Sequence, residues 1–500
     1  MNTPPHRFMP ALGAFLLVAC GSDSTAPGRP LTVSAVSPAS GLVVGGTSVT
    51  ITGTNFIDVT GVTIGGAELA DQMVVSATQI TGTTPVGASF GPADLIVTTS
   101  GHGSGRCSGC FSYDPLGIQA QPITAGLSHT CAFTSSGAAY CWGANYSGEL
   151  GGGSRTGSSV PVAVTGGLTF RVLSADGEEQ TAGLAFTCGV TSSGAAYCWG
   201  NNDRGQLGNG DNTGPEQCAP LSGACSTTPV AVAGGLSFST VSAGLLHTCG
   251  LTSAGAAYCW GDYNGGTLGT APPANPGVPG AVSGGLSFSA LATGGHHTCG
   301  LTGAGMAYCW GVNTLGQLGV GTTTGPETCF SQGSFPCSRV PVPVATALRW
   351  ASITAGHGHT CALTPGGAAY CWGRNYEGQL GDGTLGNALT PVAVAGGTKF
   401  SALFARLSYT CGLTESGAAY CWGNNDRGQL GDGSTTFSTT PVGVAGGLTF
   451  SFLAAGFYHT CGLTTSGAAY CWGYNFNGQL GDGSTNDGPT PVAVSGWPPQ

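Results

Sequence analysis

Charged side chains are scarce in this sequence. Lys, Arg, Asp and Glu make up 7% of its 500 residues, whereas an ordinary soluble chain carries about 25%. Only 12 residues are Lys or Arg, and the formal net charge is −10. Because nucleic-acid binding depends on a basic surface, the composition argues against a nucleic-acid partner.

Long apolar runs are missing as well, and helix signals are few. No run reaches the roughly 18–20 residues of a membrane-spanning helix, so we expect contact with a membrane only through an attached lipid. Glycine, in contrast, is abundant with 91 residues, and 29 prolines and 21 cysteines accompany it. The glycines follow no three-residue period, which excludes collagen, and the 41% hydrophobic content argues against a disordered chain.

Residues 1–19 have the pattern of a secretory signal peptide. Arg7 precedes a nine-residue apolar stretch, which is within the usual length of a hydrophobic region. The stretch ends in Leu-Val-Ala-Cys at Cys20. This resembles the lipobox of bacterial lipoproteins, and the resemblance implies that Cys20 is lipidated, with residues 20–30 as a tether. We therefore expect an exported lipoprotein of the outer membrane or cell surface, or a secreted protein if Cys20 is incidental.

The other cysteines form ten close pairs with none left over, as is typical of an oxidising compartment. We predict a disulfide in each pair. Cys107 and Cys110 also have the CxxC spacing of redox and metal sites, but this motif stands alone, which favours a small disulfide loop. The pairs are Cys107 with Cys110, Cys131 with Cys141, Cys188 with Cys198, Cys218 with Cys225, Cys249 with Cys259, Cys299 with Cys309, Cys329 with Cys337, Cys361 with Cys371, Cys411 with Cys421 and Cys461 with Cys471.

Residues 31–115 have the pattern of short β-strands. Apolar and polar residues alternate from Val49 to Thr52, as expected for a half-buried strand. The runs Gly-Gly-Thr at 45–47, Ile-Thr-Gly-Thr-Asn-Phe at 51–56 and Ile-Gly-Gly at 64–66 resemble the IPT/TIG family of immunoglobulin-like domains. The resemblance implies a small antiparallel sandwich that serves as a spacer or a binding module.

Residues 116–500 contain a sevenfold repeat. Its core reads His-Thr-Cys-x-Leu-Thr-x-x-Gly-Ala-Ala-Tyr-Cys-Trp-Gly, then x-Asn-x-x-Gly-Gln-Leu-Gly-Asp-Gly, and it recurs about every 50 residues. Gly137 and its equivalents lie where a three-residue hairpin loop requires glycine, so we predict a loop over 135–137. That register places Cys131 opposite Cys141, about 4.5 Å away between Cα atoms, within disulfide reach.

Tyr140 and Trp142 flank Cys141 and therefore point to the opposite face of this hairpin. Sheets stacked side by side would bury both faces. Seven such β units predict an all-β fold, a seven-bladed β-propeller preceded by a small immunoglobulin-like β-sandwich.

Three motifs of the unit carry a further resemblance. His-Thr-Cys at 129–131, Tyr-Cys-Trp-Gly at 140–143 and Gly-Gln-Leu-Gly-Asp-Gly at 428–433 resemble repeats of the regulator of chromosome condensation. The resemblance implies a propeller of seven four-stranded blades. It also implies guanyl-nucleotide exchange on a small nuclear GTPase and chromatin binding, which an exported acidic chain would not meet.

Histidine recurs at one position of the unit, where Phe186 and Tyr409 replace it in two blades. We expect these histidines to form hydrogen bonds within their own blades rather than a catalytic or metal-binding ring. Aspartates in the Gly-Asp-Gly turns are assigned to turn chemistry, with calcium binding as the alternative. The histidines are His129, His247, His297, His359 and His459, and the aspartates are Asp382, Asp432 and Asp482.

One position of the unit varies while most are nearly constant. It is the fifth residue after the second Cys, in an expected surface loop. Because exposed aromatic residues are typical binding anchors, we predict a partner-binding surface here, with neutral variation as the alternative. The residues are Tyr146, Asp203, Asn264, Thr314, Tyr376, Asp426 and Phe476.

Two insertions, over about 211–228 and 322–340, fall at the same position of the unit, and each holds a cysteine pair. A cystine-braced loop loses little entropy on binding. We therefore consider both loops, with Phe330 and Phe335 in the second, as partner contacts, the alternative being that they are ornamental.

Together these observations predict an exported, lipid-anchored, monomeric and non-catalytic protein that presents a propeller face to a protein or glycan. No catalytic residue, metal site or cofactor stands out. Two other functions remain open: nucleotide exchange, and an enzyme in the central channel, which convergent carboxylates or histidines would favour.

Overall fold

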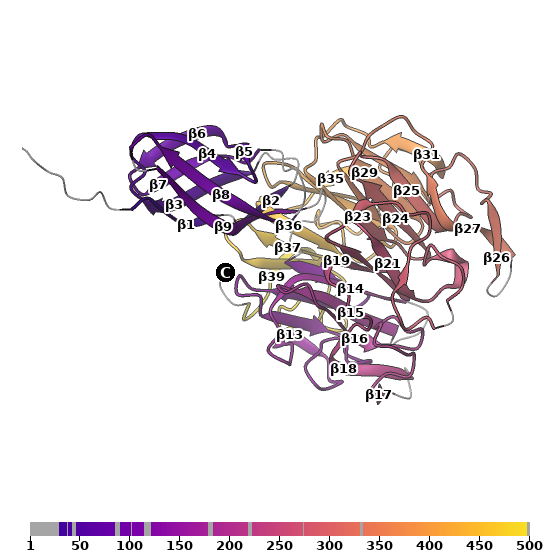
Figure 1. The fold of residues 1–500 in the computed structure, drawn as a ribbon. Coiled ribbons are helices and arrows are strands. Elements are labelled where there is room, and N and C mark those ends of the chain that lie inside the picture. The colour runs from indigo at the N-terminus through magenta and orange to yellow at the C-terminus, as the bar shows by residue number, and fades with distance from the viewer. Residues whose placement is uncertain are drawn as a thin grey trace, which may run out of the picture.

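The computed structural model describes residues 30–497, apart from 38, 43–46, 86–90, 102, 115–121, 179–183, 219–222, 274 and 331–333. The expected signal peptide and Cys20 lie outside the described residues. The chain forms an N-terminal sandwich and a ring of sheets (Figure 1). Within the described ranges, no helix is long and apolar enough to cross a membrane.

The N-terminal sandwich consists of two sheets. Its strands are β1 (Thr32–Ser37), β2 (Ser40–Leu42), β3 (Ser48–Thr54), β4 (Val59–Ile64), β5 (Ala67–Glu68), β6 (Ala70–Ser76), β7 (Gln79–Thr83), β8 (Gly91–Thr99) and β9 (Gly103–Asp114). One sheet has the order β1-β3-β7-β6 and the other β2-β9-β8-β4-β5. Ile51, Leu95 and Phe111 are fully buried between them, so the alternation seen in the sequence faces a core.

Cys107 and Cys110 are free thiols, and the prediction of a disulfide between them is wrong. Both lie on β9, where the register with β8 shifts between Ala93 and Leu95. Both side chains pack against the core of the sandwich, and the Cys110 thiol donates to the Cys107 carbonyl at 3.3 Å. Burial raises the pKa of Cys110 to about 12, which disfavours the thiolate needed for oxidation.

The other strands form seven antiparallel sheets, one for each unit, which confirms the seven-bladed propeller. The blades are, in order: β10 (Ile123–Ala125), β11 (His129–Phe133), β12 (Ala139–Gly143), β13 (Ser158–Ala163); β14 (Phe170–Glu178), β15 (Leu184–Thr191), β16 (Ala196–Asn201), β18 (Ala224–Ala231); β19 (Phe238–Ala243), β20 (His247–Thr252), β21 (Ala257–Gly261), β22 (Gly280–Ala281); β23 (Phe288–Thr293), β24 (His297–Thr302), β25 (Ala307–Val312), β27 (Ser334–Pro343); β28 (Ser352–Ala355), β29 (His359–Leu363), β30 (Ala369–Gly373), β31 (Ala388–Ala393); β32 (Ala402–Arg406), β33 (Tyr409–Leu413), β34 (Ala419–Gly423), β35 (Ser438–Gly443); and β36 (Phe450–Ala455), β37 (His459–Thr464), β38 (Ala469–Gly473), β39 (Gly488–Ala493).

The first strands of the blades surround the axis, and each contacts the first strand of the next blade, including β36 with β10. The insertions add β17 (Glu216–Gln217) to blade 2 and β26 (Glu327–Phe330) to blade 4, and blade 3 carries a short 3-10 helix, η1 (Asn264–Gly266). We call the end of the ring that carries turns such as 135–137 the hairpin face. The loop face is the opposite end, which carries loops such as 144–148.

The hairpin register is the one predicted. Cys131 lies opposite Cys141 on the paired strands, Gly137 has a φ of 82°, and the Thr134 N–H donates to the Ala138 carbonyl at 3.0 Å. The same opposition of the two cysteines recurs in every blade.

Each blade hairpin carries the disulfide that this register predicts. The Cα atoms of the bonded cysteines are 4.0–4.1 Å apart. The structure thus joins Cys131 to Cys141, Cys188 to Cys198, Cys249 to Cys259, Cys299 to Cys309, Cys361 to Cys371, Cys411 to Cys421 and Cys461 to Cys471. Disulfides also join Cys218 to Cys225 and Cys329 to Cys337, in the two insertions. Nine of the ten predicted pairs are therefore bonded, and the pair on β9 is the exception.

Adjacent blades are joined by one contact that repeats at all seven junctions. Between blades 1 and 2, the backbone carbonyl of Glu149 accepts hydrogen bonds from Trp199 Nε1 at 2.9 Å and Thr187 Oγ1 at 3.0 Å. The glycine two residues later packs under the same indole, since a Cβ on Gly151 would lie 2.8 Å from Nε1. The accepting carbonyls are those of Glu149, Gln206, Thr267, Gln317, Gln379, Gln429 and Gln479.

The repeated histidines also join blades, which corrects the expectation that each bonds within its own blade. His297 Nε2 lies 2.8 Å from Thr360 Oγ1 of the next blade, and this hydroxyl donates to the Gln317 carbonyl. Because the hydroxyl proton is used in that bond, Thr360 Oγ1 accepts the hydrogen bond from His297, and Nε2 carries the imidazole proton. Alternation along the strand turns His and Cys toward the next blade and Thr toward the preceding one, which explains the crossing. The equivalent pairs are His129–Thr187, His247–Thr298, His359–Thr410, His459–Thr130 and Tyr409–Thr460.

Blades 7 and 1 close the ring without sharing a strand. Thr130 and Trp142 bind the Gln479 carbonyl at 3.0 Å, as at the other junctions. Trp497 packs on Trp142 with ring centroids 6.0 Å apart. In each of the other blades, an aromatic residue at or just before the start of the first strand packs on the equivalent Trp. Trp497 takes that place in blade 1, although it comes from the far end of the chain. The six equivalents are Phe170, Phe238, Phe288, Trp350, Phe400 and Phe450.

The free thiols can be tested by alkylating the denatured, unreduced protein. We expect label on Cys107 and Cys110, because every other described cysteine is held in a disulfide. Peptide mass mapping identifies the labelled residues, and a peptide in which Cys107 is bonded to Cys110 would contradict the structure.

Acid should destabilise the ring through its histidines. Burial lowers the pKa of His297 and its four equivalents to about 3, below the ordinary value of about 6.5. The unfolded chain therefore binds more protons, and stability is lost as pH falls from about 6.5 toward 3. In His297→Phe, which copies Phe186 of blade 2, the slope of unfolding free energy between pH 4 and 6 should fall by about 1.4 kcal/mol per pH unit.

Urea unfolding at several pH values measures this slope. Tyr409→Phe is the matched control, because it removes a contact between blades without removing a group that titrates in this range. It should lower stability at every pH with an unchanged slope. An unchanged slope in His297→Phe would contradict the assignment.

Candidate binding site

A pocket of about 460 Å³ opens on the loop face where blades 6, 7 and 1 meet. We call it the aromatic pocket. It contains three of the seven variable residues, which belong to blades 1, 6 and 7 and meet because the ring closes. The pocket is lined by Leu127, Ser128, Ala144, Tyr146, Glu149, Ala185, Asp426, Arg427, Tyr458, Tyr474, Phe476 and Asn477.

Four aromatic rings line this pocket. Phe476 and Tyr474 lie nearly parallel, with an interplanar angle of 10° and centroids 6.3 Å apart. Tyr458 meets Tyr474 edge-on at 6.3 Å, and the Arg427 guanidinium lies over the Tyr474 ring at 4.9 Å. Phe476 is 68% exposed. A large apolar ring held open to solvent beside other rings is typical of an interaction site.

Two carboxylates border the same pocket. Glu149 is fully buried and accepts the backbone N–H groups of Tyr146 at 3.1 Å and Ser147 at 2.7 Å. Burial raises the pKa of Glu149 to about 7, although these hydrogen bonds oppose the shift. Asp426 is exposed and accepts from Asn424 Nδ2 at 3.0 Å. The Tyr146 hydroxyl donates to Asn477 Oδ1 at 2.9 Å, which ties blade 1 to blade 7 at the pocket wall.

The other four variable residues lie on blades 2 to 5, outside the lining of this pocket. Asp203 accepts the N–H of Ala224 at 2.8 Å and so supports the blade 2 insertion. Asn264 donates to the Asp262 carboxylate. Thr314 and Tyr376 are exposed.

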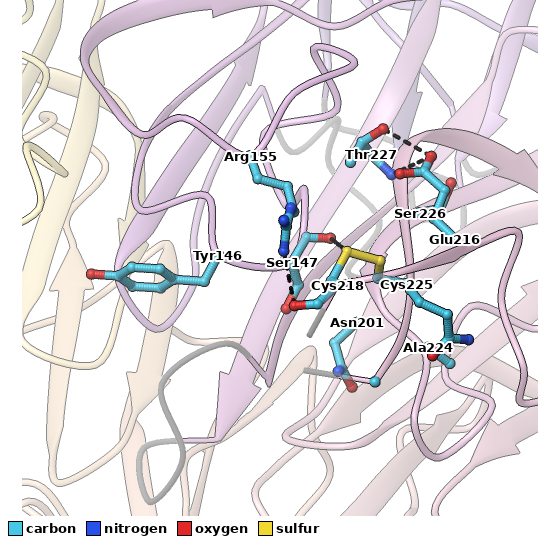
Figure 2. Close-up of a disulfide and its surroundings, with 12 residues drawn as sticks. Tyr146, Ser147, Arg155, Asn201, Glu216, Cys218, Ala224, Cys225, Ser226 and Thr227 are labelled. Carbon is cyan, nitrogen blue, oxygen red and sulfur yellow. Dashed lines mark hydrogen bonds between the residues drawn. A yellow bond between two sulfur atoms is a disulfide. The ribbon is translucent and has the colours of Figure 1, made fainter. Parts of the chain in front are cut away.

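The blade 2 insertion packs against the loop that carries Tyr146. Arg155 of blade 1 donates to the Cys218 carbonyl at 2.9 Å, and the Cys218 sulfur lies 3.8 Å from the Ser147 carbonyl. Figure 2 shows the Cys218–Cys225 disulfide on one side of Ser147 and the Tyr146 ring pointing away from it. The insertion therefore braces the base of the loop on the side away from the Tyr146 ring.

The blade 4 insertion lies against the blade 3 loop in the same way, since β26 and β27 contact η1. A Cβ on Gly265 would lie 3.5 Å from the Phe335 ring, so Phe335 packs on that loop. The side chain of Phe330 lies outside the described residues.

The centre of the ring is a well of about 1100 Å³ that opens on the hairpin face. An apolar cluster that includes Leu245, Leu407 and Phe457 closes it toward the loop face. Arg406 of blade 6 crosses the ring to Asp176 of blade 2, with Nη1 3.0 Å from Oδ2. Burial raises the pKa of Asp176 to about 6, against the effect of the guanidinium.

Arg406 stands where five other blades have glycine. That glycine makes room for the histidine ring, since a Cβ on Gly356 would lie 2.3 Å from His359 Cε1. Blade 6 has Tyr409 in place of this histidine and can therefore carry the arginine. The charged residues lining the well, among those described, are Arg349, Lys399, Arg406 and Glu415.

One described cluster has the proximity of metal ligands, namely Glu216, Cys218 and Cys225. The two sulfurs are bonded to each other, so neither can act as a thiolate ligand. In the Gly-Asp-Gly turns, Asp382 accepts the Thr384 N–H at 2.9 Å, and Asp432 and Asp482 make the same turn contact, as expected for turn chemistry.

Comparison with known families agrees with this architecture. The RCC1-like domain matches residues 180–499, and a regulator of chromosome condensation (RCC1) repeat matches residues 123–149. The chain belongs to the RCC1-like family. Residues 31–114 match the IPT/TIG domain, so the N-terminal sandwich is a domain of that type.

Among curated relatives, this RCC1-like chain is 29% identical over 285 residues to the ultraviolet-B receptor UVR8 of Arabidopsis thaliana, which is 56% of this chain and 60% of the receptor. It is 30% identical over 145 residues to the human E3 ubiquitin-protein ligase HERC2, 29% of this chain and 3% of the ligase. The chain thus spans less than two thirds of either relative.

Among solved structures, human WBSCR16 superposes with a TM-score of 0.60 at 19% identity, covering 72% of this chain and 94% of that one. Yeast RCC1 (Prp20), solved in complex with Kap60, superposes with a TM-score of 0.59 at 20% identity. The match covers 76% of this chain and 85% of yeast RCC1. At these identities the likeness shows the propeller fold alone.

Sequence reasoning missed several pocket residues, above all Glu149 and Tyr474. Glu149 is visible in the sequence as a departure from the Gln of Gly-Gln-Leu-Gly. Tyr474 lies at a second variable position, two residues before Phe476. Neither could be placed in a pocket without the order of blades around the closed ring.

Proposed function

We propose that this chain is an exported, lipid-anchored and non-catalytic protein that binds a protein or glycan partner at the aromatic pocket. The observation that carries the proposal is the meeting of Tyr146, Asp426 and Phe476 in one pocket. The repeat holds most of its other positions nearly constant to stack the blades, so variation at the loop tips can serve recognition.

The pocket has the composition of a small binding site. Ligand sites combine apolar and aromatic walls with a few fixed polar groups. Here the rings of Tyr474 and Phe476 would supply contact area, and Asp426 and Asn477 would supply directed hydrogen bonds. Because the Tyr146 loop is held at its base by Glu149 and the insertion disulfide, little conformational entropy would be lost on binding.

The compartment part of the proposal rests on nine disulfides and on the lipobox-like segment at Cys20. Disulfides persist in oxidising compartments, and no nucleic-acid partner is expected there for an acidic chain. Nucleotide exchange and an enzyme in the central well are the alternatives, and no observation on the described residues favours either.

Lipidation can be tested by labelling cells that produce the full chain with radioactive palmitate. We expect label on the wild type and none on Cys20→Ala, because the cysteine is the acceptor of the acyl chains. Equal labelling of the two would remove the anchor from the proposal.

Binding at the aromatic pocket can be tested with a glycan array and with pull-downs that use the whole exported chain. Phe476→Ala should weaken retention of any bound partner by tenfold or more, since losing a central aromatic anchor costs about 2 kcal/mol. Tyr376→Ala is the matched control, an exposed aromatic at the same repeat position but outside the pocket. Equal retention by Phe476→Ala and wild type would contradict the proposal.

A further inference from the structure

The chemistry of the aromatic pocket narrows its ligand class. We propose that the pocket binds an organic ammonium group, either of a small solute such as choline or of a choline lipid headgroup. This inference rests on the proposed function, because it assigns a ligand class to the same pocket.

The rings provide the first argument. The face of an aromatic ring carries negative electrostatic potential, and cages of such rings bind ammonium ions. Tyr146, Tyr458, Tyr474 and Phe476 line one pocket of about 460 Å³. One of these rings already accepts a cation, since the Arg427 guanidinium lies 4.9 Å from the Tyr474 centroid.

The second argument is the negative charge that the protein leaves unmatched. A buried carboxylate is costly unless a cation faces it, yet Glu149 is fully buried and none of the ion pairs formed by the described residues includes it. Those ion pairs leave out Asp426 as well. Arg427 is the third charged residue of the lining. It pairs with Asp487 at 4.0 Å rather than with Glu149 or Asp426.

The repeat shows that Glu149 is not needed to fold its loop. In five other blades a glutamine takes this position, and its amide oxygen accepts the backbone N–H that corresponds to that of Ser147. A neutral side chain therefore does the structural work elsewhere. The carboxylate occurs in the blade whose loop tip enters the aromatic pocket, which points to a cationic ligand rather than a neutral sugar.

A proton balance follows from this arrangement. Burial raises the pKa of Glu149 to about 7, and a bound cation would favour the ionised form. Binding should then release a proton from Glu149, and affinity should rise as pH increases through about 7.

Isothermal titration of the full chain with choline tests the proposal directly. The comparison ligand is the neutral isostere of choline, in which carbon replaces the charged nitrogen. We expect choline to bind at least about tenfold more tightly than the isostere, because only choline gains the attraction to the rings and carboxylates. Titrations at pH 6 and pH 8 should show the tighter binding at pH 8.

Glu149→Gln is the decisive variant, since glutamine occupies the position in five other blades and should leave the fold intact. It should weaken choline binding about tenfold and abolish its pH dependence. The variant should still unfold cooperatively, although its amide NH₂ cannot accept the Tyr146 N–H as Glu149 Oε1 does. Tyr376→Ala should bind choline as the wild type does. Cosedimentation with phosphatidylcholine vesicles distinguishes the two sources of the ligand. Sedimentation with the vesicles would indicate a lipid headgroup, and binding of free choline without sedimentation would indicate a small solute.

Equal affinity for choline and the isostere, binding of a neutral sugar without choline, or no binding of choline at all would overturn the proposal. So would an unchanged affinity in Glu149→Gln. In each case, loss of partner retention in Phe476→Ala would leave the proposed function standing, whereas equal retention would remove both.

Discussion

The ring depends on one backbone carbonyl per junction that receives two hydrogen bonds from the next blade. An indole N–H and a threonine hydroxyl meet there at 2.8–3.0 Å at all seven junctions. The tryptophans involved are fully buried, and hydrogen bonds in such a dry interface are costly to leave unmade. The contact uses no charged group, which explains how so large a chain manages with 7% charged residues.

This constraint also decides which positions can vary. The unit must keep its Trp, Thr and Gly-x-Leu-Gly residues to stack one blade on the next, whereas the tip of each loop touches solvent. Closure of the ring then makes neighbours of blades 6, 7 and 1, and their loop tips form the aromatic pocket. Trp497 contributes to this closure, because it packs on Trp142 of blade 1. The residues that stack the blades and the loop-tip residues to which we assign recognition thus occupy different positions of the same short repeat.

Local features of the ring could be predicted from the sequence, and features that span it could not. Gly137 and the cysteine spacing determine the hairpin register, because both act within a few residues. The partner of His129 lies 58 residues away, and Arg406 of blade 6 pairs with Asp176 of blade 2 across the ring. The periodicity of the sequence predicts neither contact. The pocket needed the same long-range information, although its three variable residues were each identified as variable. The prediction for the cysteine pair of β9 was wrong because spacing alone does not show that the Cys110 thiol donates to the Cys107 carbonyl and that both cysteines stay free.

Hydrogen exchange of the indole N–H groups, followed by NMR on the ¹⁵N-labelled full chain, tests the central claim most directly. If blades 7 and 1 are joined as the other blades are, the Trp142 indole should exchange as slowly as the six equivalent indoles, from Trp199 to Trp472. Fast exchange of Trp142 alone would mean that the ring is open at this junction and that the aromatic pocket does not form.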